Sequence, residues 1–226
     1  MRVELITLAV CCTLAAQDPL QRERDRMVAD QIEARGVRDG GVLRAMRAVP
    51  RHLFVPPAVA KLAYEDHPLP IGHEQTISQP YIVALMTELL DVKRDSIVLE
   101  IGTGSGYQAA VLSLLAREVY TIELIPELAH SAAQRLRELG YSNVVVKTGD
   151  GYAGWPEKAP FDRIILTAAP PEIPHTLIDQ LKRGGKLVAP VGRSSQTLVL
   201  LSKRRDGTVE RKSVLPVAFV PMRPAR

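Results

Sequence analysis

Three glycines in close succession are the strongest chemical signal in the sequence. They stand at positions 102, 104 and 106 of the segment VLEIGTGSGY, residues 98–107. The dinucleotide-binding pattern G-x-G-x-x-G is not met, because Tyr107 stands where the third glycine belongs. Glycines between a strand and a helix let the backbone turn sharply and approach a ligand closely. We therefore expect a ligand-binding loop made by Gly102, Thr103, Gly104 and Gly106.

Carboxylates at three places narrow the choice of ligand. Glu100 lies just before the loop, where it would repel a pyrophosphate but would suit a ligand that carries an ammonium and a sulfonium. Glu123 follows Gly102 by 21 residues and can accept both hydroxyls of a ribose. Asp150, which precedes Gly151, can reach an adenine edge. The set favours S-adenosyl-L-methionine as cofactor, and the alternative is a group of glycine turns with surface carboxylates.

The elements that must position these residues follow from the hydrophobic pattern. Strands are predicted at 97–101, 118–122, 144–147, 164–167 and 186–189, and helices at 107–116, 127–139 and 173–181. This alternation is typical of a doubly wound, mostly parallel α/β sheet. Residues 197–203 and 208–217, joined through Asp206-Gly207, predict a C-terminal antiparallel hairpin.

A helical region precedes this sheet. One helix is predicted at 21–35, and Asp39 can cap a second. Residues 50–80 are rich in proline and are interpreted as an ordered connection with one short helix at 58–63. Ser78 then begins a further helix, since Ser-Gln-Pro is a favourable helix start.

The first residues are interpreted separately from the rest. Residues 5–16 form a mostly apolar run, too short for a membrane-spanning helix, which needs about 20 residues. Residues 1–20 are therefore either a signal peptide or an N-terminal extension. We expect residues 21–226 to form a single domain, with 21–80 on the substrate side and 81–226 as the cofactor-binding core.

Composition excludes several classes of protein. The chain has 226 residues, 46% hydrophobic and 24% charged, which predicts one large globular domain and excludes a disordered or multi-span membrane protein. Its two cysteines are Cys11 and Cys12, so the body of the chain offers no thiol nucleophile or zinc-thiolate site. The five histidines show no metal-ligand spacing, and we expect no metal. From Lys182 onward there are 11 basic and 2 acidic residues, which fits either nucleic-acid binding or, as we favour, solvated surface charge.

The methyl acceptor is best matched by a carboxylate. Residues 167–174 read TAAPPEIP and lack the Asn or Asp before Pro-Pro that amino-group methyltransferases carry. A carboxylate is already ionised near neutral pH and needs neither base, thiol nor metal. In the segment LPIGHEQTISQPY, residues 69–81, the hydroxyl of Ser78 could hold a carboxylate oxygen, or it could serve only as a helix cap.

The combined motifs resemble the protein-L-isoaspartate O-methyltransferase family. The resemblance is carried by LPIGHEQTISQPY (69–81), by the glycine-loop segment VLEIGTGSGY (98–107) and by Gly-Asp-Gly at 149–151. It is also carried by PFDRIILTAAPPEIP, GGKLVAPVG and FVPM further on. It implies a Rossmann-like S-adenosylmethionine-dependent methyltransferase that methylates the free α-carboxyl of isoaspartyl residues in damaged proteins. The ester then closes to a succinimide, which begins repair.

The resemblance also assigns roles to residues. It implies that Ser78 is catalytic and that Thr76, Ile77 and Val220 contact the substrate. It further implies a cytoplasmic monomer with no nucleic-acid partner and no stable membrane association. The alternatives are a methyltransferase of another carboxylate or of RNA, and a nucleoside-binding domain without catalysis.

Overall fold

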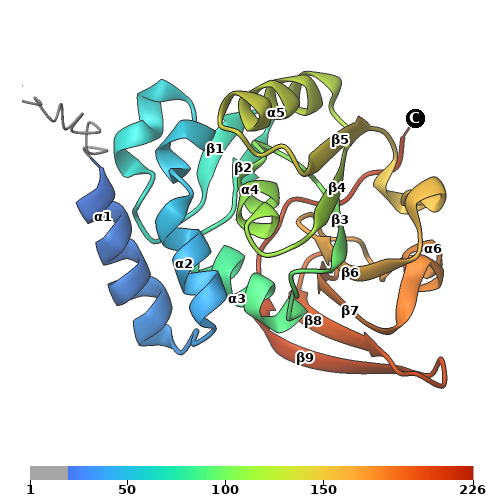
Figure 1. Ribbon diagram of the computed structural model, residues 1–226. Helices are drawn as coiled ribbons and strands as arrows, with labels where there is room; N and C mark the ends of the chain where they lie inside the picture. Colours follow the sequence, from blue (N-terminus) through green and yellow to red (C-terminus); the bar gives the residue numbers. More distant parts are fainter. Residues whose placement is uncertain (1–19, 226) are drawn as a thin grey trace, which may run out of the picture.

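A seven-stranded sheet forms the centre of the molecule (Figure 1). The computed structural model describes residues 20–225, and the predictions for residues 1–19 lie outside that part. The strands run in the order β5-β4-β3-β6-β7-β8-β9. Their bounds are β3 Ile97–Ile101, β4 Glu118–Glu123, β5 Val144–Thr148, β6 Phe161–Leu166, β7 Leu181–Val191, β8 Gln196–Lys203 and β9 Val209–Val217. Strands β3 to β7 pair in parallel and β8 and β9 antiparallel, which confirms the predicted fold class.

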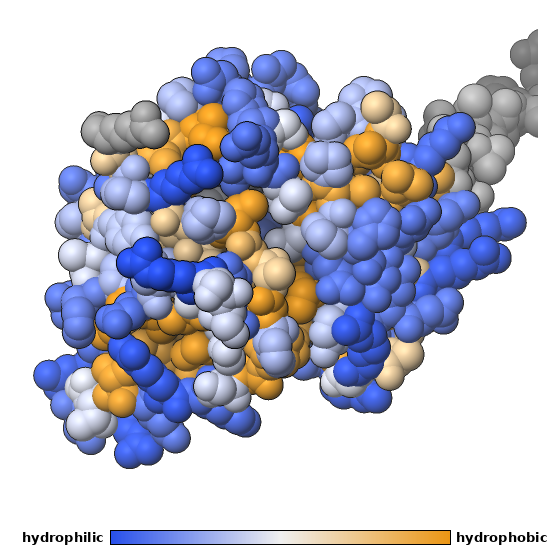
Figure 2. Space-filling view, turned by 180° about the vertical axis from the view of Figure 1, so that it is seen from behind, coloured by the Kyte–Doolittle hydropathy of each residue, from blue (hydrophilic) through white to orange (hydrophobic). Residues whose placement is uncertain are grey.

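Helices cover both faces of the sheet because its central strands are apolar on both sides. The helices that follow the N-terminal region are α3 Pro80–Leu90, α4 Tyr107–Ser113, α5 Pro126–Glu138 and α6 His175–Gln180. One buried cluster joins α3, α4, α5 and the N-terminal region to one face, and a second joins α6 to the other. On the rear surface, apolar side chains gather towards the middle and hydrophilic ones towards the rim (Figure 2).

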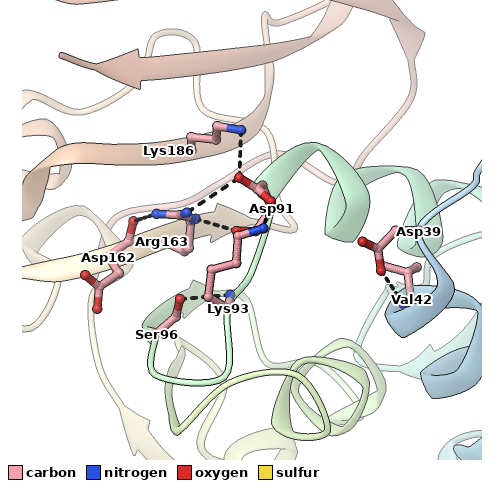
Figure 3. Close-up of polar contacts among 8 residues, drawn as sticks. All are labelled: Asp39, Val42, Asp91, Lys93, Ser96, Asp162, Arg163 and Lys186. Carbon is pink, nitrogen blue, oxygen red and sulfur yellow. Dashed lines mark hydrogen bonds and ion pairs between the residues drawn. The ribbon is translucent and has the colours of Figure 1, made fainter.

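The N-terminal helical region differs in detail from its prediction. The predicted helix at 21–35 is present, but it changes from α1 (Gln21–Arg26) to a π-helical segment (Met27–Ile32) and a 3₁₀ turn (Glu33–Arg35). The next helix, α2 (Gly40–Ala48), confirms the predicted cap, since the Asp39 carboxylate accepts a hydrogen bond from the Val42 N–H at 2.8 Å (Figure 3). Two 3₁₀ turns follow, at Arg51–Phe54 and Pro57–Leu62.

The proline-rich connection contains a hairpin that the sequence did not predict. Strands β1 (Leu69–Gly72) and β2 (Gln75–Ile77) pair antiparallel. The turn between them places His73 and Glu74 at φ of 52° and 58°. Such turns usually carry Asn-Gly, so this pair of residues gave no hairpin signal. The predicted helix after Ser78 is present, and its N-cap residue is Gln79. No side chain caps this helix, so the interpretation of Ser78 as a helix cap is wrong.

The far end of α3 is fixed to the sheet by a group of charges around Asp91 (Figure 3). The Asp91 carboxylate accepts hydrogen bonds from Lys93 and, at 3.2 Å, from Lys186 on β7. Its backbone carbonyl accepts one from Arg163 on β6 at 3.0 Å. Burial alone would raise the pKa of Asp91, but the hydrogen bonds and charges of the two lysines outweigh it and lower that pKa. The helix that follows the Ser78 segment is thus anchored at its other end.

Candidate active site

A cavity opens where the carboxyl ends of β3, β4 and β6 meet. This is the point at which the strand order reverses, the usual ligand site of open α/β sheets. Its empty volume is about 1050 Å³, part of it open to solvent. Its walls come from the glycine loop, from residues 122–125 at the end of β4, from the hairpin β1–β2 and from the C-terminal residues 220–223. The cavity is large enough for a nucleoside-sized ligand.

The turn at Gly102 brings β6 against the glycine loop. Gly102 has φ of +100°, which side-chain-bearing residues rarely adopt, and a Cβ there would run into the Thr167 hydroxyl. That hydroxyl lies 2.5 Å from the Gly102 carbonyl oxygen and donates to it. The N–H of Gly102 donates to Ile122 O on β4 at 2.8 Å. Only glycine allows this close approach.

The Glu123 carboxylate is an acceptor in the cavity wall that two backbone hydrogen bonds hold in place. It is 6% exposed, and each of its oxygens accepts one backbone N–H: Oε2 from Gly104 at 2.8 Å and Oε1 from Ile125 at 3.0 Å. These two bonds fix the carboxylate and leave acceptor capacity on both oxygens. A pair of neighbouring ribose hydroxyls fits that arrangement.

Glu100 does not line the cavity. Its side chain is fully buried beneath the loop. Burial raises the pKa of Glu100 to about 8; the Thr121 hydroxyl acts against this shift, and the nearby Glu123 carboxylate adds to it. Its carboxyl group is therefore held in the neutral form around pH 7, which does not match the sequence-based expectation of a carboxylate facing the positive ligand.

Asp150 and Gly106 also lie outside the cavity wall. Asp150 caps the 3₁₀ turn Gly151–Ala153, and its oxygens accept from Tyr152 N at 2.8 Å and from Ala225 N at 3.1 Å. Gly106 is the N-cap residue of α4 and lies close to Leu136 of α5. Both residues shape the site by fixing the segments that do line it.

A second cavity adjoins the first through a shared wall. Its empty volume is about 990 Å³, and it lies between the Ser78 segment and residues 216–220. The residues that line both cavities are Thr76, Ser78, Thr167 and Val220. None of the described residues that line the second cavity carries a charge. Three of the four residues at the junction, Thr76, Ser78 and Thr167, thus carry hydroxyl groups.

Most of the predicted site residues meet at these cavities. Those that line the first one are Thr76, Ile77, Ser78, Gly102, Thr103, Gly104, Glu123, Gly151 and Val220. Sequence reasoning missed Gln108 and the C-terminal residues Met222 and Arg223. The tail reaches the site because Ala169 N donates to Val220 O and Met222 N to Ala169 O, each at 2.8 Å. No periodic pattern marks this tail, so only the family motif FVPM, which implied Val220, pointed to it from the sequence.

Among residues 20–225 there is no group of three or more His, Asp or Glu side chains placed to hold a metal ion. The glycine loop at the reversal of strand order, with a carboxylate at the end of the neighbouring strand, defines the class as a Rossmann-like methyltransferase. The residues fit S-adenosylmethionine through the fixed carboxylate of Glu123.

Comparison with known proteins identifies the particular family. The family model for protein-L-isoaspartate(D-aspartate) O-methyltransferase matches residues 22–225. The chain is 56% identical over 215 residues to a protein-L-isoaspartate O-methyltransferase of a Synechococcus strain, covering 92% of this chain and 88% of that one. It is 57% identical over 201 residues to one from Opitutus terrae, covering 88% and 86%. The chain belongs to the protein-L-isoaspartate O-methyltransferase family.

Solved structures agree with this assignment. A protein-L-isoaspartate O-methyltransferase superposes with a TM-score of 0.78 at 30% identity, covering 88% of this chain and 65% of that one. A Plasmodium falciparum protein described by the same activity, in complex with S-adenosyl-L-homocysteine, has a TM-score of 0.77 at 24% identity, covers 88% and 98%, and supports the fold. The family, the methyltransferase activity and the dependence on S-adenosylmethionine predicted from the sequence are confirmed.

The Glu123 geometry predicts a defined loss of cofactor affinity. Replacing Glu123 by Ala should weaken binding of S-adenosylhomocysteine by about 1–3 kcal/mol, the range for a lost hydrogen bond to a charged group. Titration calorimetry measures this, with circular dichroism to check that the variant folds. An unchanged affinity would remove Glu123 from the cofactor site.

The raised pKa of Glu100 predicts that the free energy of unfolding of the cofactor-free protein depends on pH. Its pKa rises from 4.5 to about 8 on folding, so the native state binds the extra proton between these values. The stability from this proton is complete below pH 4.5 and is lost as pH rises through 8, at about 1.4 kcal/mol per pH unit between the two values.

Glu100→Gln removes that titration. Chemical denaturation between pH 5 and 8 should therefore show the variant gaining stability relative to the wild type as pH rises. Parallel profiles for the two proteins would contradict the buried neutral carboxyl.

Proposed function

We propose that the first cavity holds S-adenosylmethionine, that the second holds the isoaspartyl segment, and that Ser78 positions the acceptor carboxylate where the two cavities meet. The observation that carries this proposal is the shared wall with its hydroxyl groups on Thr76, Ser78 and Thr167. In this arrangement Thr76 and Val220, which line both cavities, contact the substrate, whereas Ile77 lines only the first cavity and lies on the cofactor side. Residues 21–226 act as a single methyltransferase domain.

The chain's contribution to the reaction is binding and orientation. The cofactor, when bound, supplies a methyl group made electrophilic by its sulfonium. Glu123 binds the ribose, and Gly102 and Gly104 permit close approach of the backbone. Asp150 fixes the turn that carries Gly151 at the adenine side.

The second cavity favours a carboxylate as methyl acceptor, because methyl transfer to a carboxylate needs no proton transfer. An α-carboxyl group has a pKa near 3.5 and is ionised at neutral pH, so no general base is required. The second cavity, which no described charged residue lines, separates the carboxylate from bulk water, and transfer of a methyl to it neutralises charge. Ser78 can donate its hydroxyl proton to one carboxylate oxygen and leave the other free. This role follows from its place at the junction, since it does not cap α3.

The basic C-terminal segment from Lys182 onward does not favour RNA as substrate. Lys203 donates to the carbonyls of Ile178 and Leu181, both at 2.8 Å. Lys182 pairs with Asp162, and Arg204 with Glu210. These side chains have partners within the protein. Protein substrates without a nucleic-acid partner are therefore the function we propose.

We propose that the protein acts in the cytoplasm, because S-adenosylmethionine is available there. We further propose a monomer, as the family resemblance implies. No described helix is long and apolar enough to cross a membrane. The proposal predicts an uncleaved N-terminus in protein isolated from its native host. Intact-mass spectrometry of the cytosolic fraction measures this, and a mature form that begins near Ala16–Asp18 would instead establish export.

The proposed role of Ser78 predicts that its replacement lowers turnover but leaves the affinity for the cofactor unchanged. Ser78→Ala should lower turnover on an isoaspartyl peptide by about 10- to 100-fold, the effect of one hydrogen bond to a charged group. The affinity of this variant for S-adenosylhomocysteine should stay within about twofold of the wild-type value.

The wild-type rate should follow ionisation of the acceptor carboxyl group, so it should rise with pH through about 4 and then level off.

The matched control is Ser213→Ala, which changes an exposed serine on β9. It should leave turnover unchanged. Normal turnover of Ser78→Ala would remove Ser78 from the reaction while leaving the family assignment intact.

A further inference from the structure

Gln108 is a buried amide in the cavity wall that none of the roles above uses. It follows Tyr107 in the first turn of α4, is 7% exposed and lines the first cavity. Its sequence position gave no reason to single it out. The functional question is which end of the amide faces the cavity.

The hydrogen bonds of Thr87 settle that orientation. The Thr87 hydroxyl, on α3, donates its one proton to Val83 O at 2.7 Å, as threonine commonly does within a helix. Its oxygen can then only accept, and Gln108 Nε2 lies 2.9 Å from it. The amide nitrogen therefore faces Thr87, and the carbonyl oxygen points away from it.

The carbonyl oxygen is left open. Gln108 Oε1 accepts no hydrogen bond from a described residue, and it is not sealed from solvent either. The space that Gln108 lines is the first cavity. A fixed, open carbonyl in a mostly buried wall selects a ligand group that carries N–H or O–H donors.

The sheet order indicates which part of the ligand reaches it. Glu123 ends β4, on one side of β3. Helix α3, which holds Gln108 through Thr87, packs on β6 and β7, on the other side of β3. With the ribose and adenine on the β4 side, as proposed above, the donor left for Gln108 is the amino group of the cofactor's amino-acid end.

We infer that Gln108 Oε1 binds the α-ammonium group of S-adenosylmethionine and that Thr87 is the positioning residue that holds the amide in this orientation. The inference rests on the proposed placement of the ribose at Glu123. It adds a binding residue contributed by α4 and ties the cofactor to the helix that follows the Ser78 segment.

Two ligands that differ in the amino-acid part test the inference. S-adenosylhomocysteine carries the ammonium group, whereas 5′-methylthioadenosine lacks the whole amino-acid end. Gln108→Leu keeps similar volume and removes the acceptor. Calorimetry should show the Kd for S-adenosylhomocysteine rising by about tenfold or more, with the Kd for 5′-methylthioadenosine unchanged.

Thr87→Val is the second variant, since valine has nearly the shape of threonine and carries a methyl group in place of the hydroxyl. It should weaken the binding of S-adenosylhomocysteine by a smaller factor and leave the affinity for 5′-methylthioadenosine unchanged. This variant keeps the inference testable if Gln108→Leu does not fold. Equal losses for both ligands, or no loss for either, would overturn the inference. A wild-type protein that binds neither ligand would overturn the proposed cofactor site itself.

Discussion

The chain leaves β3 at Gly102 in a left-handed conformation, and the loop that starts there is held by the strands on both sides. Gly102 N donates to Ile122 O on β4 at 2.8 Å, and Thr167 N after β6 donates to Ile101 O at 2.9 Å. A side chain at position 102 would collide with the Thr167 hydroxyl, so this convergence requires glycine. The same loop fixes Glu123 through the N–H of Gly104. The cofactor side of the site takes its shape from this one turn.

The proposed acceptor side is assembled from segments that are far apart in the sequence. The hairpin β1–β2 delivers Ser78, and α3 behind it is anchored at Asp91 to β6 and β7. The C-terminal tail is tied at Ala169 and delivers Val220 to the same junction. Residues on loops can hold a substrate in a defined position because rigid elements fix the ends of those loops.

The sequence predicted the sheet well because each central strand is a short apolar run bounded by turn residues. It did not predict how single side chains point. Leu99 and Ile101 pack in one buried cluster, and Glu100 between them points to the opposite side of the strand, where it is buried and does not line the cavity. The hairpin at residues 73 and 74 was not predicted, because His and Glu rarely occupy turn positions with positive φ. Gln108 could not be found either, since its role depends on the packing of α4 against Thr87 of α3.

The central claim is that the junction of the two cavities recognises a carboxylate by its position. The most direct measurement compares initial rates of methyl transfer from labelled S-adenosylmethionine to two peptides of one sequence, one isoaspartyl and one aspartyl. The side-chain carboxylate of normal aspartate is displaced by one methylene from the isoaspartyl position, a misplacement that costs on the order of a hundredfold. The account predicts that the isoaspartyl peptide reacts faster by about that factor. Equal rates on the two peptides would contradict it.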